Sequence, residues 1–78
     1  MNIIKELTDI FREVFDSPQL LIDKNTTADD IEAWDSFSHV NLILFIEKRF
    51  SIKIPLGETQ ALRNVGAMAE LIQSKLNI

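Results

Sequence analysis

The chain contains no cysteine. It can therefore form neither a disulfide nor a cysteine-based zinc site, and it has no thiolate to act as a nucleophile. Its single histidine, His39, has no second imidazole with which to bind a metal, and the acidic run 29–32 lacks the glycine and the spacing of a calcium loop. The glycine-flanked nucleophile elbow of a serine hydrolase is also absent. We expect no catalytic residues and no metal site.

Long apolar runs and an excess of basic side chains are missing too. The longest apolar run, Leu42–Ile46, has five residues, whereas a membrane-spanning helix needs about 20. The N-terminus passes directly into a charged amphipathic pattern, which is not typical of a signal peptide. Eight basic and twelve acidic residues give a net charge of −4, which repels nucleic-acid phosphates. We expect a cytoplasmic protein with no membrane span and no nucleic-acid partner.

The remaining composition is that of a small globular protein. Hydrophobic residues make up 46% and charged residues 26% of the 78 residues, which is typical of a chain that folds around one core. We therefore expect one domain spanning residues 1–78.

Apolar residues recur at helical spacing in three stretches, and proline or turn residues separate them. We predict three longer helices and one short, irregular one, at residues 3–15, 36–50, 65–76 and 56–62 respectively. Ser17-Pro18 should end the first helix, because the residue before proline avoids the helical region. The prediction is an all-α fold, a small four-helix bundle with a long loop between the first and second helices.

The long loop, residues 17–35, needs anchors to the core. Leu20, Leu21 and Ile22 are the candidates, and one helical turn near 28–31 should begin at Thr27 in a capping box with Asp30. Further along the chain, Ile52 and Ile54 should pin the extended linker 51–55 to the core, and Asn64 should cap the last helix. A loop of this length in a small domain is often functional.

The helix that begins at Ser36 has two apolar faces. At about 100° per residue, one side of this helix carries His39, Leu42, Ile43, Ile46 and Phe50. The opposite side carries Phe37, Val40 and Leu44, and Phe45 lies on the flank. A bundle of this size cannot bury both faces. We expect the strip Phe37/Val40/Leu44, rimmed by Asn41, Glu47 and Lys48, to be exposed and to dock a partner protein. The alternative is that the long loop covers it.

Ser36 is the candidate reactive residue. It stands where an acidic loop becomes a helix, and the free N–H groups and the dipole of a helix N-terminus favour a phosphate there. Ser36 could instead be a helix cap, although Asp35 can also take that role and leave the Ser36 hydroxyl free. Trp34 and His39 are interpreted as packed residues, the histidine being hydrogen-bonded rather than a ligand or base.

Nearly the whole chain resembles an acyl carrier protein in length, helix order, long first loop and acidity. The resemblance depends on Asp35-Ser36-Phe37, followed by Val40, Leu42, Glu47, Phe50, Ile52 and Ile54-Pro55. It implies that Ser36 receives 4′-phosphopantetheine through a phosphodiester, with Asp35 as its acidic neighbour, and that acyl groups are carried as thioesters on the thiol of this arm. It also implies partner docking through Phe37, Val40, Asn41, Leu44, Glu47 and Lys48.

The resemblance further implies the partners. A phosphopantetheinyl transferase (a holo-acyl carrier protein synthase) would supply the arm with Mg²⁺ and coenzyme A, and acyl-transferring, ligating or condensing enzymes would use it. The carrier itself would be monomeric and not an enzyme. Fatty-acid, polyketide or related specialised biosynthesis is the implied setting, with a D-alanyl or peptidyl carrier, or an unmodified helical adaptor, as alternatives.

Several residues depart from the family pattern. Phe37 replaces a leucine, and Ser38, His39 and Asn41 occupy positions that are often acidic in fatty-acid carriers. Lys48 and Arg49 make the end of the helix basic. Together with Trp34 before the motif, these departures favour a specialised carrier outside core fatty-acid synthesis.

Overall fold

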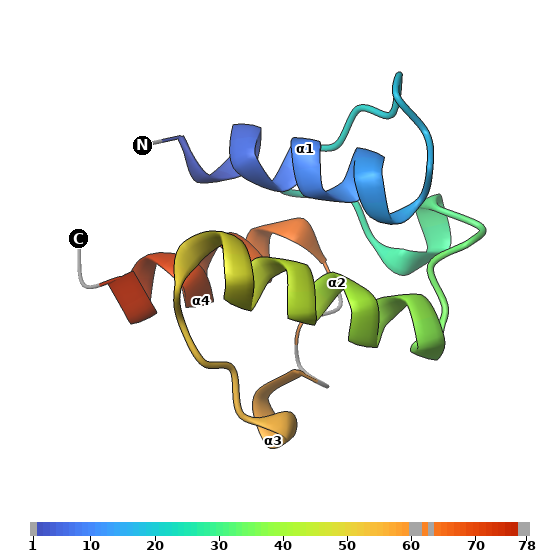
Figure 1. Cartoon of the computed structure of the whole chain (residues 1–78). Helices are drawn as coiled ribbons and strands as arrows, with labels where there is room; N and C mark the ends of the chain where they lie inside the picture. Colours follow the sequence, from blue (N-terminus) through green and yellow to red (C-terminus); the bar gives the residue numbers. More distant parts are fainter. Residues whose placement is uncertain (1, 60–61, 63, 77–78) are drawn as a thin grey trace.

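The computed structural model describes residues 2–59, 62 and 64–76. This part of the chain forms a bundle of four α-helices and contains no strand (Figure 1). The helices are α1 (Ile3–Val14), α2 (Ser36–Phe50), α3 (Leu56–Thr59) and α4 (Val65–Leu76). A 3₁₀ turn, η1 (Ala28–Asp30), lies in the long loop between α1 and α2. The predicted all-α fold is confirmed, and α2 and α4 have the predicted bounds. No helix among these residues is both long and apolar enough to cross a membrane.

Helix α1 ends slightly earlier than its apolar pattern predicts. The Asn2 side chain caps its start by accepting a hydrogen bond from the backbone N–H of Lys5 at 3.1 Å. At the other end Phe15, predicted to be helical, is already the C-cap, and Asp16 adopts the left-handed conformation with φ of 50°. The helix is thus ended by this left-handed residue, just before Ser17-Pro18.

The core lies between α1 and the helices α2 and α4, along which α1 packs (Figure 1). Each of these helices contributes one apolar face, and the loops add a few side chains. The buried residues are Leu7, Ile10 and Phe11 from α1, Leu42, Ile43, Ile46 and Phe50 from α2, Val65, Met68 and Ile72 from α4, and Ile31, Trp34, Ile54 and Leu62 from the connections. The predicted core face of α2 is therefore confirmed.

The long loop is fastened to the start of α4 by backbone hydrogen bonds. The N–H groups of Val65 and Gly66 donate to the carbonyl oxygens of Thr26 and Lys24, both at 2.9 Å. The approach is so close that a Cβ at Gly66 would lie 2.8 Å from the Lys24 oxygen, so only glycine fits without a shift. The capping box of Thr27 with Asp30 is present as predicted.

One predicted loop anchor is wrong. Leu20 and Ile22 pack against the core, but Leu21 between them is 79% exposed. In an extended chain successive side chains point to opposite sides, so the three residues cannot all reach the core. The carbonyl oxygen of Leu20 is also held, because it accepts a hydrogen bond from Arg12 Nε of α1 at 2.7 Å.

The linker after α2 is positioned by two isoleucine side chains and by a hydrogen bond from its backbone to the Glu47 side chain. Ser51 ends α2 in the left-handed conformation, Ile54 is buried, and Ile52 is partly buried against the core, as predicted. The Glu47 carboxylate accepts a hydrogen bond from the backbone N–H of Ile54 at 2.7 Å. This contact turns the chain back beneath α2 toward α3.

The short helix α3 covers the first part of its predicted range 56–62. Residues 60 and 61 of that range lie outside the described residues. An ion pair between Glu58 and Lys75, with oxygen and nitrogen 3.2 Å apart, joins α3 to α4. The N-terminus of α4 is capped as predicted, because the Asn64 side chain accepts a hydrogen bond from the Ala67 N–H at 2.7 Å.

The burial of Phe50 gives a test of the core. Phe50 is 6% exposed, so Phe50→Ala should lower the free energy of unfolding by about 3–5 kcal/mol through lost apolar contact and a residual cavity. Urea unfolding measures the loss. Phe45→Ala on the same helix, where the ring is 38% exposed, is the matched control and should cost clearly less. Equal losses would mean that the faces of α2 are wrongly assigned.

Candidate functional site

Ser36 is the first residue of α2, and it does not cap the helix. The N-cap is Asp35, whose carboxylate accepts a hydrogen bond from the Ser38 N–H at 2.9 Å. In return the Asp35 N–H donates to the Ser38 hydroxyl, also at 2.9 Å, which completes a capping box. Ser36 is exposed, and its hydroxyl has no hydrogen-bond partner among the described residues. Asp35 therefore caps the helix, and Ser36 does not.

Hydrogen bonds join the turn that presents Ser36 both to the loop before it and to the helix after it. The Ser38 hydroxyl donates to the carbonyl oxygen of Ala33 at 2.8 Å, so one side chain closes the first turn of α2 onto the loop before it. The His39 N–H donates to the Asp35 carbonyl oxygen at 2.9 Å, as the first bond of the helical ladder. The Ser36 hydroxyl consequently stands on a fixed backbone.

The electrostatics of this turn favour a charged Asp35. The backbone N–H of Ser38 is the main cause that lowers the pKa of the Asp35 carboxyl below its ordinary value, and the Ser38 hydroxyl and other backbone N–H groups of the turn add to it. Removal from water acts in the opposite direction but is outweighed. The carboxylate is thereby bound to the helix N-terminus, and its lowered pKa makes it a weaker base toward Ser36 than an ordinary aspartate.

Trp34 and His39 support the turn from below. The Trp34 ring is buried and meets Phe11 of α1 edge-on, with ring centroids 5.2 Å apart. Its Nε1–H donates to His39 Nδ1 at 3.0 Å. An indole can only donate, so Nδ1 is the unprotonated nitrogen, and His39 Nε2 donates to the carbonyl oxygen of Thr59 at 2.9 Å. His39 is a packed, hydrogen-bonded residue, as predicted.

The contact with Thr59 is the part of the site that the sequence did not predict. His39 and Thr59 are 20 residues apart, and a backbone carbonyl leaves no signature in the local sequence. Through this bond α3 is attached to α2 one turn from Ser36. The path Phe11–Trp34–His39–Thr59 therefore connects α1 with α3 behind the turn that presents Ser36.

The apolar strip of α2, defined as Phe37, Val40 and Leu44, is open to solvent. Its members are 78%, 54% and 56% exposed, so the alternative that the long loop covers the strip is wrong. At its rim Asn41 and Lys48 are exposed, whereas Glu47 is only partly exposed, since its carboxylate is bound to the linker. The strip begins beside Ser36 and runs along the helix for about two turns.

This arrangement suits a residue that is modified by another protein. A serine hydroxyl is a weak nucleophile unless a neighbouring base activates it, and no side chain of the described residues hydrogen-bonds to that of Ser36. Within the same part of the chain no group of three or more His, Cys, Asp or Glu side chains is placed to hold a metal ion. What the site offers is an accessible hydroxyl on a fixed turn beside an exposed apolar strip.

The charge of the cap predicts a pH dependence. Because the pKa of Asp35 is lowered in the folded state, its carboxylate adds stability above the unfolded pKa of about 3.9 and loses it as the pH falls through the folded pKa. Asp35→Asn keeps a capping side chain without the charge. Wild type should be more stable than this variant at pH 7, and the difference should shrink below about pH 4. A difference that stays constant from pH 7 to pH 3 in urea unfolding would contradict this role of the charge.

Comparison with known proteins places this geometry in a family. No protein-family model matches the chain. Two curated relatives from Brachyspira hyodysenteriae, one of them from strain ATCC 49526 / WA1, are both named acyl carrier protein. Each is 32% identical over 75 residues, which cover 94% of this chain and 95% of the relative.

A solved structure agrees with these relatives. The solution NMR structure of holo acyl carrier protein from Geobacter metallireducens matches with a TM-score of 0.90 and 48% identity, over 99% of this chain and 88% of that one. Similarity in sequence and in fold thus extends over nearly the whole chain. On this evidence the chain belongs to the acyl carrier protein family.

Proposed function

We propose that this protein carries acyl intermediates as thioesters on a 4′-phosphopantetheine arm attached to Ser36. The observation that carries the proposal is the exposed Ser36 hydroxyl, which has no hydrogen-bond partner among the described residues because Asp35 caps the helix in its place. The matched structure from Geobacter metallireducens is that of a holo acyl carrier protein, which supports a prosthetic group at the corresponding site.

The residues of the turn fit such a group. The oxygen of an exposed hydroxyl can become part of a phosphodiester without displacing any packed side chain. The N-terminus of a 15-residue helix favours the negative charge of that phosphate. The neighbouring Asp35 carboxylate is already bound to the Ser38 N–H, which offsets part of its repulsion. When attached, the arm supplies a thiol that forms thioesters, and the chain itself supplies a rigid and accessible anchor.

The transfer onto Ser36 would be the work of a second protein. With Mg²⁺, a phosphopantetheinyl transferase would move the phosphopantetheinyl group from coenzyme A to the Ser36 oxygen, breaking the pyrophosphate bond and releasing adenosine 3′,5′-bisphosphate. The transferase would also take the hydroxyl proton, so the carrier needs no base of its own and would not be an enzyme. Docking of this transferase and of the acyl-transferring, ligating or condensing enzymes would use the exposed strip. Phe37, Val40 and Leu44 would provide apolar contact, and Asn41, Glu47 and Lys48 the polar rim.

The wider setting also belongs to the proposal. Residues 1–78 would act as one monomeric carrier domain in the cytoplasm, within fatty-acid, polyketide or a related specialised biosynthesis. The departures at Phe37, Asn41 and Lys48 support a specialised pathway, since these exposed residues change the surface that partners would contact. A flexible arm on a small rigid body keeps the cargo at high local concentration near a docked active site.

Attachment at Ser36 can be tested by mass. Incubation of the protein with coenzyme A, Mg²⁺ and a phosphopantetheinyl transferase of broad specificity should add one phosphopantetheinyl group, detected as a single mass increase. Ser36→Ala should show none and should retain its helical circular dichroism, because the native hydroxyl makes no hydrogen bond in the described structure. If wild type gains no mass, or if Ser36→Ala gains as much, Ser36 is not the attachment site.

The docking strip can be tested by reversing its polarity. Phe37→Glu or Leu44→Glu should weaken docking by about 1–3 kcal/mol, read as a lower kcat/KM for the transferase, while the melting temperature should change little because both side chains are exposed. Leu21→Glu is the matched control, since Leu21 is as exposed as Phe37 but lies on the long loop. Collapse of the melting temperature would mean that these side chains belong to the core and that the face is wrongly assigned. An equal effect of Leu21→Glu on kcat/KM would show that the strip does not dock the enzyme.

A further inference from the structure

The two ends of α2 present opposite charges to solvent. At the Ser36 end the exposed acids Asp29, Glu32 and Asp35 precede the helix. At the other end the exposed basic side chains are Lys48 and Arg49, on the last turn, and Lys53, on the linker. Lys48 lies one turn beyond Leu44 on the same side of the helix, so the apolar strip continues directly into this basic end.

A hollow is present at the basic end. It has a volume of about 470 Å³ and is lined by Leu44, Glu47, Lys48, Ser51, Ile52 and Lys53. The left-handed turn at Ser51 forms it, because the chain reverses there and brings the linker beside the last turn of α2. Leu44, which lines the hollow and is exposed, is also the last member of the strip. The hollow is therefore continuous with the proposed docking surface.

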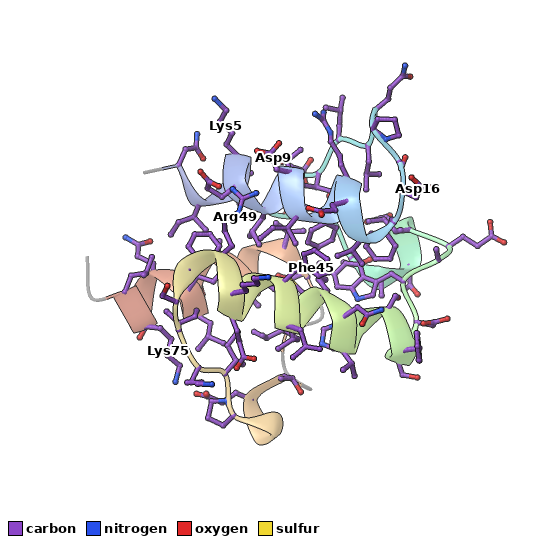
Figure 2. All side chains as sticks on the ribbon, viewed as in Figure 1. Lys5, Asp9, Asp16, Phe45, Arg49 and Lys75 are labelled. Carbon is purple, nitrogen blue, oxygen red and sulfur yellow. The ribbon has the colours of Figure 1, made fainter. Side chains whose placement is uncertain are left out.

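The other charges near the hollow are already used within the fold. The Glu47 carboxylate accepts the Ile54 N–H. The Arg49 guanidinium forms an ion pair with Glu6, and Figure 2 shows Arg49 extending toward α1. Lys48 and Lys53, in contrast, have no acid within ion-pair distance among the described residues. Among the described residues, two ammonium groups without an acidic partner thus stand at an opening whose lining is mixed, with Leu44 and Ile52 as its apolar members.

We propose that this hollow receives an acidic side chain of the docking partner, so that the partner surface is basic opposite the Ser36 end and acidic opposite Lys48 and Lys53. The inference rests on the proposed docking of a partner on α2. An acidic group is the complement that two unpaired ammonium groups select. Nucleic acid and other polyanions are disfavoured as occupants, since the chain as a whole has a net charge of −4.

Opposite charges at the two ends would fix the direction of docking. A partner turned end for end would bring like charges together, and such repulsion is an effective means of excluding wrong arrangements. Lys48 follows Ser36 by 12 residues, so a rise of about 1.5 Å per residue places the basic end about 18 Å from the attachment point. The acidic group of the partner would therefore lie about that far from the place where the arm enters its active site.

Three synthetic helical peptides with the same apolar face test the proposal. The bipolar peptide has lysines at one end and glutamates at the other, a second has lysines at both ends, and a third has glutamates at both. Each is titrated into ¹⁵N-labelled protein, and dissociation constants are taken from amide shifts. Wild type should bind the bipolar peptide most tightly, with shifts extending from Phe37 to Lys53.

The deciding quantity is the dissociation constant of the peptide with lysines at both ends, divided by the dissociation constant of the bipolar peptide. The double variant Lys48→Glu with Lys53→Glu should lower this ratio at least about threefold, because two exposed ion pairs become repulsive. The control double variant, Lys5→Glu with Lys24→Glu, changes the total charge equally at two exposed lysines away from α2 and should leave the ratio unchanged. If both double variants lower it equally, only net charge matters and the proposal is wrong.

These peptides separate this inference from the proposed function. They bind the unmodified protein, and Ser36→Ala should give the same ratio as wild type. Attachment of the arm together with an unchanged ratio in the double variant would overturn the directional docking alone. No attachment together with the expected change of ratio would overturn the carrier function and leave a directional docking surface.

Discussion

The structure depends on the burial of one face of α2. Leu42 and Ile46 are fully buried where α2 meets α1 and α4, and removing such side chains from water is the main source of stability in so small a domain. Because α2 is apolar on two sides, burying this face leaves the other, with Phe37 and Leu44, in solvent. The surface that we assign to partners is thus a direct result of how the core is built.

The second constraint acts at the start of the same helix. Two adjacent residues can each cap α2, and the fold uses the carboxylate of Asp35. The hydroxyl of Ser36 therefore makes no hydrogen bond within the described part of the chain. The backbone around it is held by Ser38 and, through His39, by Trp34. A site that is modified by another protein needs both an accessible hydroxyl, which can react, and a fixed backbone, which presents that hydroxyl in one place.

Signals that lie close together in the chain could be predicted, and contacts between distant segments could not. The bounds of α2 follow from a cap and a helical period within a few residues. The outward turn of Leu21 depends on how the loop meets the core, and the bond from His39 to Thr59 joins segments 20 residues apart. The hollow beside Lys48 depends on one left-handed residue, Ser51, whose conformation no local pattern required.

The position of Trp34 gives the protein an intrinsic optical reporter. The chain has one tryptophan and no tyrosine, so its ultraviolet-excited emission comes almost entirely from this indole. The ring is stacked on His39, with centroids 6.0 Å apart, and lies two residues before Ser36. Events at that serine occur next to the emitting ring, so they can be followed by fluorescence without attaching a dye.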